Sequence, residues 1–367
     1  MAETPDADHA AARPITISVD AMGGDQGLSA VVAGIAMSAK KNPDVAFIVH
    51  GDGKALRKQL KKRKILDRCE IRDTAGVVRM DDKPSHVLRN GQDTSMWSAI
   101  EAVKNGEADA CVSCGNTGAL MLLSVMRLRK LPGVNRPAIA CFWPSRNPGG
   151  FNVMLDVGAD IKADENDLLQ YALMGMSYAR NGLGLQRPRV GILNLGTEEF
   201  KGRPELKLAH DLVAEAAPEA NFEFVGFVEG GDIPSDRVDV IVTDGFTGNI
   251  ALKTGEGTAT LIRDFLRDAF KATPLSRIAA ILALTSLRRL SKRIDPRRVN
   301  GGVFLGLNGT VVKSHGSADA TGVSSAIKLA FRLAETGFAE RLAARVASVG
   351  TARQDGAPDG ATNEQQE

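Results

Sequence analysis

Residues 109–120 read DACVSCGNTGAL, and residues 239–250 read DVIVTDGFTGNI. Each stretch contains an Asp, a short apolar run, Ser or Thr, and two glycines with a Thr directly before the second. The apolar run is typical of a buried strand, and the residues after the second glycine are typical of a helix. The repeated pattern therefore predicts two strand–turn–helix units, each with a glycine turn at the end of its strand.

The rest of the chain alternates between strand-like and helix-like segments. Strands are expected at residues 15–19, 45–49, 110–113, 138–142, 151–157, 190–195, 222–228 and 240–243. Helices are expected at residues 30–40, 55–62, 95–103, 119–129, 165–180, 205–216, 250–270 and 324–344. The strand segments are continuously apolar, which indicates a sheet covered on both faces, and their alternation with helices indicates parallel pairing. The predicted fold is a three-layer α/β protein with a mostly parallel sheet.

The composition is that of an ordinary globular protein, because 43% of the 367 residues are hydrophobic and 25% are charged. The formal net charge of +2 gives no indication of nucleic-acid binding. Four cysteines, including a lone C-x-x-C at Cys111 and Cys114, are typical of a reduced cytosolic protein rather than a disulfide framework or a zinc site. Residues 1–13, which lack the features of a secretory signal, and residues 346–367 are expected to be disordered. Residues 14–345 then form one folded unit of one or two lobes.

The glycine turns are candidate ligand loops, because ligands of α/β sheets bind beyond the carboxyl ends of the strands. Glycine lets a ligand approach the backbone, and the free N–H groups of the following helix favour an anion. One such turn alone would favour a plain tight turn, whereas the repetition favours two ligand loops around one site. Polar turns also follow other strands: VDAMGGDQG at 19–27, LDVGADIKADE at 155–165, LNLGTEEFKGRPELK at 193–207 and VKSHGSADATG at 312–322.

Several common catalytic motifs are missing from the sequence. It has no P-loop, no G-x-S-x-G nucleophile elbow and no H-E-x-x-H zinc motif. The nearest approach to a dinucleotide-binding motif, GDGKAL at 51–56, lacks the third glycine. Neither a metal nor a cofactor is therefore expected. A polar anion site without a protein nucleophile indicates that the anion itself is the nucleophile.

Seven motifs together resemble the bacterial phosphate acyltransferase (PlsX) family of phospholipid synthesis: VDAMGGD, SCGNTGAL, RPAIA, LDVGA, LNLGTEEFKG, VTDGFTGNIALK and KSHGSADA. The resemblance implies an enzyme that converts acyl-[acyl-carrier-protein] and inorganic phosphate to acyl phosphate and free carrier protein. It also implies the fold of phosphate acetyltransferases and isopropylmalate dehydrogenases, and a homodimer. Gln26, Cys114 and Asp160 stand where the family usually has His, Ala and Asn, so we expect no acid–base role at Gln26 and no catalytic thiol at Cys114.

In such a reaction the phosphate oxygen attacks a thioester carbonyl, and a thiol with a pKa of about 8.5 leaves without strong acid assistance. The enzyme is then expected to position the reactants and to supply hydrogen-bond donors. The candidate catalytic residues are Asn116, Thr117, Thr247, Asn249, Lys201 and His315. The candidate substrate-binding residues are Asp20, Gly23, Gly24, Asp25, Ser113, Gly115, Gly118, Asp156, Thr197, Glu198, Asp244, Gly245, Gly248, Gly316 and Ser317. Among them, Asp20, Asp25, Asp156 and Asp244 are expected to orient loops, because added negative charge would repel phosphate. His315 is equally compatible with an ordinary surface histidine.

Three further segments suggest binding partners. The apolar residues Met121, Leu122, Val125 and Met126 are candidates for the berth of the acyl chain, although each is also compatible with core packing. Residues 274–295 predict two short basic, amphipathic helices with a break near Thr285–Ser286, suited to an anionic membrane surface or to a dimer interface. Seven Lys or Arg residues at 54–64 form a solvated helix face or a docking site for acidic acyl carrier protein.

The resemblance implies a cytoplasmic, peripherally membrane-associated enzyme whose product feeds a membrane-bound glycerol-3-phosphate acyltransferase. Two other functions share much of this pattern. One is a phosphate acyltransferase that uses acyl-CoA, and the other is a non-enzymatic scaffold on the membrane surface. Only the enzymes would form a product that hydroxylamine traps.

Overall fold

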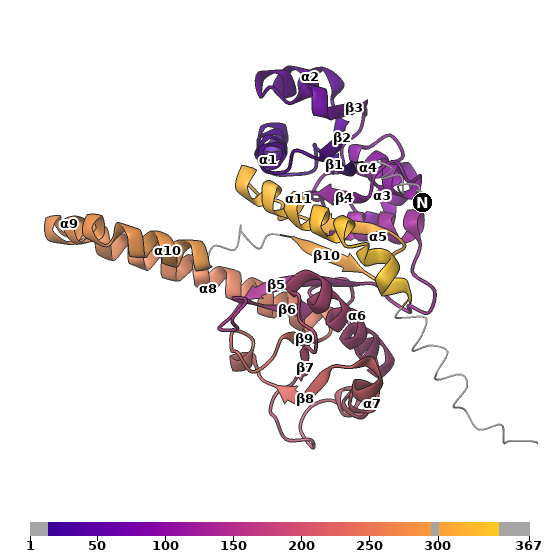
Figure 1. The fold of residues 1–367 in the computed structure, drawn as a ribbon, viewed down its shortest axis with the longest axis vertical. Coiled ribbons are helices and arrows are strands. Elements are labelled where there is room, and N and C mark those ends of the chain that lie inside the picture. The colour runs from indigo at the N-terminus through magenta and orange to yellow at the C-terminus, as the bar shows by residue number, and fades with distance from the viewer. Residues whose placement is uncertain (1–13, 295–300, 345–367) are drawn as a thin grey trace, which may run out of the picture.

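A computed structural model describes residues 14–294 and 301–344, so the two tails expected to be disordered lie outside the described residues. The strands form one sheet of eleven strands in the order β3-β2-β1-β4-β11-β10-β5-β6-β9-β7-β8 (Figure 1). Their bounds are β1 Ile15–Asp20, β2 Val45–Gly51, β3 Cys69–Asp73, β4 Ala110–Ser113, β5 Ala138–Pro144, β6 Phe151–Leu155, β7 Arg189–Leu193, β8 Glu223–Val228, β9 Val240–Val242, β10 Gly302–Leu305 and β11 Thr310–Lys313. The prediction of an α/β fold with a mostly parallel sheet is confirmed.

The sheet consists of two parallel blocks. The strands β3, β2, β1, β4 and β11 pair in parallel, and so do β6, β9, β7 and β8. Between the blocks, β10 is antiparallel to both β11 and β5, and β5 is antiparallel to β6. Three antiparallel steps reverse the direction, so the second block runs opposite to the first. The two glycine turns therefore do not follow strands that point the same way.

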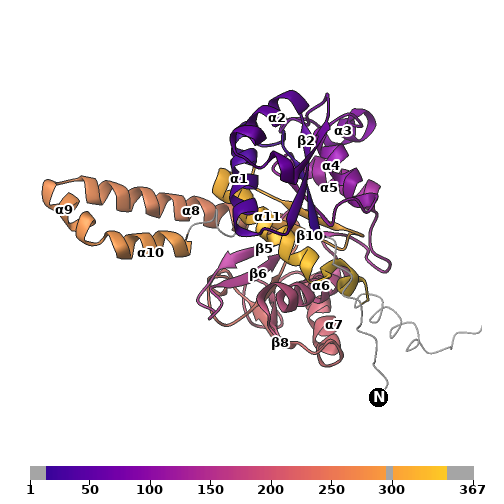
Figure 2. The same cartoon turned by 45° about the horizontal axis from the view of Figure 1, so that its top comes forward.

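Helices cover both faces of the sheet (Figures 1 and 2). The bounds are α1 Gly27–Lys41, α2 Gly53–Lys62, α3 Pro84–Asn90, α4 Ser95–Lys104, α5 Thr117–Leu128, α6 Glu165–Leu183, α7 Pro204–Ala220, α8 Gly245–Lys271, α9 Pro274–Leu282, α10 Leu284–Ile294 and α11 Ala320–Glu335, with short 3-10 turns at Leu66–Arg68 and Gly230–Asp232. Helices α1, α2, α6, α7 and α11 share one apolar core with the sheet, and α3, α4 and α5 share the other. Neighbouring strand residues alternate between these cores: Val112 and Val312 face the first, whereas Cys111 and Val311 face the second. Burial on both faces explains the continuously apolar strands.

Three strands and one helix were not expected from the sequence. The edge strand β3 carries the charged sequence CEIRD, and β10 and β11 have only four residues each, so none shows a long apolar run. Helix α3 is a seven-residue helix within a polar segment. The predicted helix at 324–344 is interrupted, because α11 ends at Glu335 and Gly337 adopts a positive φ of 58° before residues 338–344 resume a helix.

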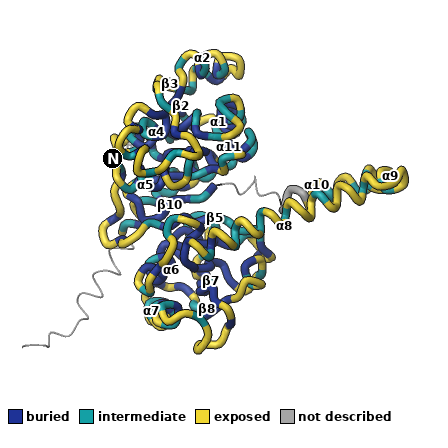
Figure 3. Tube along the Cα trace, turned by 180° about the vertical axis from the view of Figure 1, so that it is seen from behind, coloured by how far each residue is buried: buried dark blue, intermediate teal, exposed yellow. Residues whose placement is uncertain are grey.

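Helices α8, α9 and α10 form an arm that projects from the body. Figure 2 shows α8 leading outward, α9 at the tip and α10 returning beside α8. The predicted break near Thr285–Ser286 is wrong by two residues, because the chain turns at Ala283, whose N–H bonds back to Ala279 and Ile281. Ser286 accordingly lies inside α10 and is not its N-cap. In Figure 3 the outer arm is mostly exposed, whereas the strands of the body are buried.

The start of α8 also differs from the prediction. Residues 245–248, GFTG, were expected to form a turn before a helix at 250, but α8 already begins at Gly245. The Asp244 side chain caps α8 by accepting a hydrogen bond from the Thr247 N–H, and a negative charge there is favoured by the helix dipole. In the first copy of the pattern the cap is Asn116, so its glycine Gly115 precedes the helix. The two sequence repeats thus place their helix starts two residues apart.

Candidate functional site

The first loop cluster gathers the carboxyl ends of β1, β4 and β11. Asp20 and Ser113 face each other in the register of β1 and β4, and the Ser113 hydroxyl donates to Asp20 Oδ2 at 2.7 Å. The Ser95 hydroxyl donates to Asp20 Oδ1, also at 2.7 Å. The buried Asp20 carboxylate therefore ties the loop after β1 to that after β4 and to the start of α4.

Glycines allow these loops to approach backbone to backbone. A Cβ on Gly23 would lie 2.7 Å from the Gly115 Cα, and a Cβ on Gly24 would lie 3.1 Å from the Cys114 Cβ. The Asp25 N–H donates to the Gly316 carbonyl at 2.8 Å, which joins the loop after β1 to the loop after β11. The close packing leaves no space for larger residues at these turns.

The side chain of Asn116 forms hydrogen bonds to two neighbouring segments of the protein. Its Oδ1 accepts from the Ala119 N–H at 3.0 Å and caps α5, while its Nδ2 donates to the carbonyls of Met80 and Asp82. Thr117 and Gly118 form the exposed first turn of α5. Asn116 therefore fixes the glycine turn against the segment before α3.

The second loop cluster is organised by two buried carboxylates, Asp156 after β6 and Asp244 after β9. Asp156 accepts backbone N–H groups from Ile139, Ala159 and Asp160 at 2.7–3.1 Å. Burial raises the pKa of Asp156 to about 6, against the effect of these N–H groups. Gly245 packs closely here, since a Cβ on it would lie 2.4 Å from Asp156 Oδ2.

Asp244 joins α8 to the loop after β7. It accepts hydrogen bonds from the N–H and the hydroxyl of Thr247, and it forms an ion pair with Arg203. Burial alone would raise the pKa of Asp244, but the bonds from Thr247 and Arg203 outweigh it and lower the pKa. Asn249 Nδ2 donates to the Val157 carbonyl at 3.1 Å. Thr247 and Asn249 are thus bonded within the protein.

The loop after β7 carries the remaining predicted residues, Thr197, Glu198 and Lys201, and all three are exposed. Lys201 Nζ lies 2.7 Å from Glu198 Oε1, in an ion pair between side chains that are nearly half exposed. An exposed pair of this kind contributes little to stability. Its position on a loop that Arg203 ties to α8 leaves both side chains able to meet a ligand.

Helix α8 connects the two clusters. Four residues after Asn249, Lys253 Nζ lies 3.4 Å from His315 Nε2 in the loop after β11. Glu256 Oε2 lies 2.8 Å from Lys253 Nζ and 3.8 Å from His315 Nε2. Ser317 contacts the other ring nitrogen, His315 Nδ1, through its hydroxyl at 2.8 Å. Although the strand blocks run in opposite senses, α8 brings the second loop cluster within two helical turns of the first.

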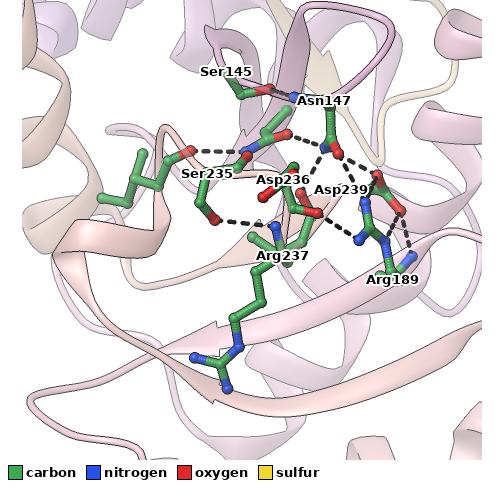
Figure 4. Close-up of polar contacts among 10 residues, drawn as sticks. Ser145, Asn147, Arg189, Ser235, Asp236, Arg237 and Asp239 are labelled. Atoms are coloured by element: carbon green, nitrogen blue, oxygen red, sulfur yellow. Dashed lines mark hydrogen bonds and ion pairs between the residues drawn. The ribbon is translucent and has the colours of Figure 1, made fainter.

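The sequence repeat also has a structural counterpart at the starts of its strands. Asp109 accepts from the Thr16 N–H of β1 at 2.7 Å, and Asp239 accepts from the Arg189 N–H of β7 at 2.8 Å. Asp239 additionally binds the Arg189 guanidinium and the Asn147 amide, as Figure 4 shows. Each repeat therefore fixes its strand with an Asp at one end and leads into a capped helix at the other.

Comparison with known proteins identifies the chain. The sequence profile of a family described as "Fatty acid synthesis protein" matches residues 15–341. The phosphate acyltransferase of Dinoroseobacter shibae is 75% identical over 342 residues, which cover 93% of this chain and 89% of that protein. The phosphate acyltransferase of Ruegeria pomeroyi is 68% identical over 369 residues and covers all of both chains.

The chain belongs to the phosphate acyltransferase family. It is an acyltransferase of fatty acid and phospholipid synthesis. Among solved structures, a phosphotransacetylase from Streptococcus pyogenes matches with a TM-score of 0.57 and 17% identity, covering 88% of this chain and 95% of that one. The EutD phosphotransacetylase from Staphylococcus aureus matches with a TM-score of 0.55 and 16% identity, covering 87% and 94%. At such identities the similarity concerns the fold, and it agrees with the predicted fold class.

Asp160 and Cys114, which the resemblance led us to expect as departures from the family motifs, both fit their surroundings in this phosphate acyltransferase. Asp160 Oδ1 accepts the Gly245 N–H at 2.9 Å, and Oδ2 accepts from the Tyr171 hydroxyl at 2.5 Å. Cys114 is buried, and burial raises the pKa of its thiol, so the thiol stays protonated. Among residues 14–294 and 301–344 no cluster of His, Cys, Asp and Glu is suited to hold a metal ion.

Two lysines near the loop clusters of this phosphate acyltransferase were not among the residues predicted from the sequence. Lys253 ends the motif VTDGFTGNIALK, and Lys313 begins KSHGSADA. The spacing of four residues between Asn249 and Lys253 places both on one side of α8, a signal that was available once α8 was known to begin at Gly245. Of the apolar residues predicted to bind the acyl chain, Met126 is exposed, whereas Met121 is buried in the core.

Proposed function

We propose that this phosphate acyltransferase moves a fatty acyl group from the thioester of acyl carrier protein to inorganic phosphate. The observation that carries the proposal is the contrast within the first loop cluster. His315 and Ser317 offer exposed polar groups there, whereas the thiol of Cys114 is buried and protonated. A site with exposed donors and an inert thiol suits direct attack by a bound anion rather than an acyl-enzyme.

In the proposed reaction an oxygen of HPO₄²⁻ attacks the thioester carbonyl carbon and forms a tetrahedral oxyanion. The C–S bond then breaks, the acyl–oxygen bond of acyl phosphate remains, and the phosphate proton passes to the departing thiolate. The thiolate is a good leaving group, so the work of the protein is to position the reactants and stabilise the oxyanion.

Within this proposal the predicted residues divide by their contacts. Asn116, Thr247 and Asn249 hold the turns in place, because their side chains bond to caps and carbonyls. His315 and Lys201 are the candidates for direct contact with substrate, together with the exposed Thr117. The carboxylates Asp20, Asp156 and Asp244 orient loops.

The decisive assay follows the loss of acyl-carrier-protein thioester with and without phosphate, and traps the product with hydroxylamine. We expect phosphate-dependent thioester loss and one equivalent of acyl hydroxamate. Acyl-CoA at the same concentration tests the alternative donor. Thioester loss that is independent of phosphate, or a stable acyl group on the protein, would contradict the proposal.

We also propose that acyl carrier protein docks on α2. The seven Lys and Arg residues of 54–64 are all exposed, while Leu56 and Leu60 anchor the helix in the core. A one-sided basic face raises the rate of encounter with an acidic partner. The pairing is electrostatic, so it weakens as salt rises.

The tip of the arm is our proposed contact with anionic membrane. The apolar residues Leu275, Ile281 and Leu282 are 71–82% exposed in α9, and the exposed Arg288 and Arg289 lie on α10. No helix among the described residues is long and apolar enough to cross a bilayer. Surface binding would bring the acyl phosphate to a membrane-bound glycerol-3-phosphate acyltransferase. Lys292 and Arg293 add to the basic residues of the hairpin predicted at 274–295, but their side chains lie outside the described residues.

A homodimer is proposed from the apolar stripe of α8. Phe246, Ile250, Leu261 and Phe265 are 51–65% exposed and follow the spacing of one side of a helix. Large apolar side chains exposed along a helix mark an interaction surface. Sedimentation of the wild type and of Phe265→Glu would test it, and we expect the substitution to yield monomers.

A further inference from the structure

Three large apolar side chains are exposed on the loops that follow β6 and β7. Ile161 follows β6 and is 81% exposed, and Leu195 and Phe200 follow β7 and are 85% and 74% exposed. Strand β9 lies between β6 and β7, and all three strands are parallel, so their carboxyl ends lie at one edge of the sheet. At two strand spacings, β6 and β7 are about 10 Å apart. The three side chains therefore belong to one region, the second loop cluster.

Hydrogen bonds hold the chain on both sides of Ile161. The Asp160 side chain accepts from the Gly245 N–H at 2.9 Å, and the Lys162 carbonyl accepts from the Arg136 guanidinium at 3.1 Å. Ile161 is exposed between these two fixed neighbours, so its exposure is a property of a well-bonded loop. A large apolar side chain held in water in this way is typical of a binding surface.

The loop after β7 closes on itself. Asn194 Oδ1 accepts from the Leu195 N–H at 2.8 Å, and Asn194 Nδ2 donates to the Lys201 carbonyl at 3.1 Å. Gly202 has a φ of 89°, and a Cβ on it would lie 2.2 Å from Asn194 Oδ1, so this position requires glycine. Leu195 and Phe200 both lie within the closed loop and remain exposed to solvent.

Both loops are bonded to the start of α8. Asp160 of the loop after β6 bonds to Gly245, and Arg203 at the end of the loop after β7 forms an ion pair with Asp244. Asp244 and Gly245 are consecutive residues, so the two loops are joined to the same point of the chain. The exposed apolar side chains therefore adjoin the polar residues of the second loop cluster.

The activity of the family requires an apolar surface beside a polar reaction site. An acyl group is transferred at its carbonyl carbon, so its hydrocarbon chain begins one bond away from the reacting atoms. Binding such a chain to exposed apolar side chains removes apolar surface from water, which favours association in proportion to the area covered. Of the residues predicted from the sequence to bind the chain, Met121 is already buried in the core and is closed to a ligand.

We propose that Ile161, Leu195 and Phe200 bind the hydrocarbon chain of the acyl group and determine the preference for its length. The inference rests on the proposed function and assigns residues to it. A long chain extends from the reaction site across these side chains, whereas a butyryl group ends close to the thioester. The three residues therefore distinguish donors by the length of the acyl chain and not by the carrier to which it is attached.

The test compares the double variant Leu195→Ala with Phe200→Ala to the wild type, using Leu208→Ala, an exposed leucine of α7, as the matched control. Initial rates are measured with the palmitoyl and the butyryl thioesters of acyl carrier protein at saturating phosphate. Loss of the apolar contacts predicts that kcat/KM for the palmitoyl donor falls about tenfold to a hundredfold in the double variant. With the butyryl donor kcat/KM should stay within about twofold, and the control should match the wild type with both donors.

Three results would overturn the assignment. Equal losses with the two donors would indicate a displaced loop, because chain length would then not matter. A selective loss of the palmitoyl rate in Met126→Ala, with the double variant unaffected, would place the chain on α5. Sedimentation of the double variant at a lower mass than the wild type would show that the side chains contact a second copy of the protein.

A fluorescent fatty acid, cis-parinaric acid, gives a readout without turnover. Its fluorescence on titration with protein should show weaker binding by the double variant than by the wild type, and unchanged binding by Leu208→Ala. Equal binding by all three proteins would count against the assignment. If the wild type consumed no thioester in response to phosphate, the proposed function would fail, whereas the fluorescence titration would still judge the site of the acyl chain.

Discussion

A methyl group added at Gly248 would collide with the loop after β6. The Cβ of Gly248→Ala would lie 1.8 Å from the Asp156 carbonyl oxygen and 3.0 Å from Thr243 Cγ2. Carbon and oxygen normally approach to about 3.3 Å, so α8 or the loop must move by roughly 1.5 Å. Hydrogen bonds to the Asp156 carboxylate hold the loop, and the cap Asp244 holds α8. A shift of either segment would therefore weaken these hydrogen bonds.

The size of the effect follows from three contributions. Overpacking costs about 3 kcal/mol at its upper end. Displacement of α8 would also weaken the bonds Gly245 N–Asp160 Oδ1 and Asn249 Nδ2–Val157 O, each with a net contribution of about 1 kcal/mol. The higher helix propensity of Ala stabilises the folded state by about 1 kcal/mol relative to Gly. The expected net loss in the free energy of unfolding is therefore about 2–4 kcal/mol.

Gly257→Ala provides the control in the same helix, because a Cβ there meets no atom within 4 Å. We expect this variant to be as stable as the wild type or more stable by up to about 1 kcal/mol. Urea unfolding followed by circular dichroism measures both variants, and the phosphate-dependent thioester assay should show at least a tenfold loss in Gly248→Ala only. Equal unfolding midpoints for the two variants would refute the argument that only glycine fits between α8 and the loop after β6 at position 248.

Three other perturbations test separate parts of the molecule. Burial lowers the pKa of Lys313 to about 8 from 10.5, so between these pH values the unfolded chain binds one proton more than the folded chain, and the stability of the wild type rises with pH. Lys313→Met should abolish that rise, which corresponds to up to about 3 kcal/mol. If the urea midpoints of the variant followed the same pH profile as those of the wild type, Lys313 would not be the cause of the rise. Leu275→Ser with Leu282→Ser should release the protein from anionic vesicles in a flotation assay without changing the rate with acyl carrier protein in solution; retention on the vesicles would remove the membrane role of the arm. Lys61→Glu with Lys62→Glu should lower kcat/KM for acyl carrier protein and flatten its salt dependence while leaving acyl-CoA unaffected, and an equal loss with both donors would argue against docking on α2.

The polar site was only partly predictable from the sequence. The glycine turn at 115–116 and the carboxylates after the strands were found because glycine and Asp after an apolar run have few other uses, whereas the second predicted turn is the first turn of α8. Lys253 was missed because a lysine inside a long helix usually belongs to a solvated face, and nothing local distinguishes it. Its meeting with His315 joins residues 62 positions apart, and such a contact exists only after β10 and β5 have placed the two blocks.

The sequence by itself determined the class of the fold, the family and the places where both repeats pass from strand to helix, because these depend on local patterns of apolar residues, glycines and caps. The structure decided the direction of the second strand block, the start of α8 at Gly245 and the turn of the arm at Ala283. Short strands such as β10 and β11 carry little local signal, so only packing against distant strands fixes them. For the same reason the pairing of α8 with the loop after β11 belongs to the tertiary structure alone.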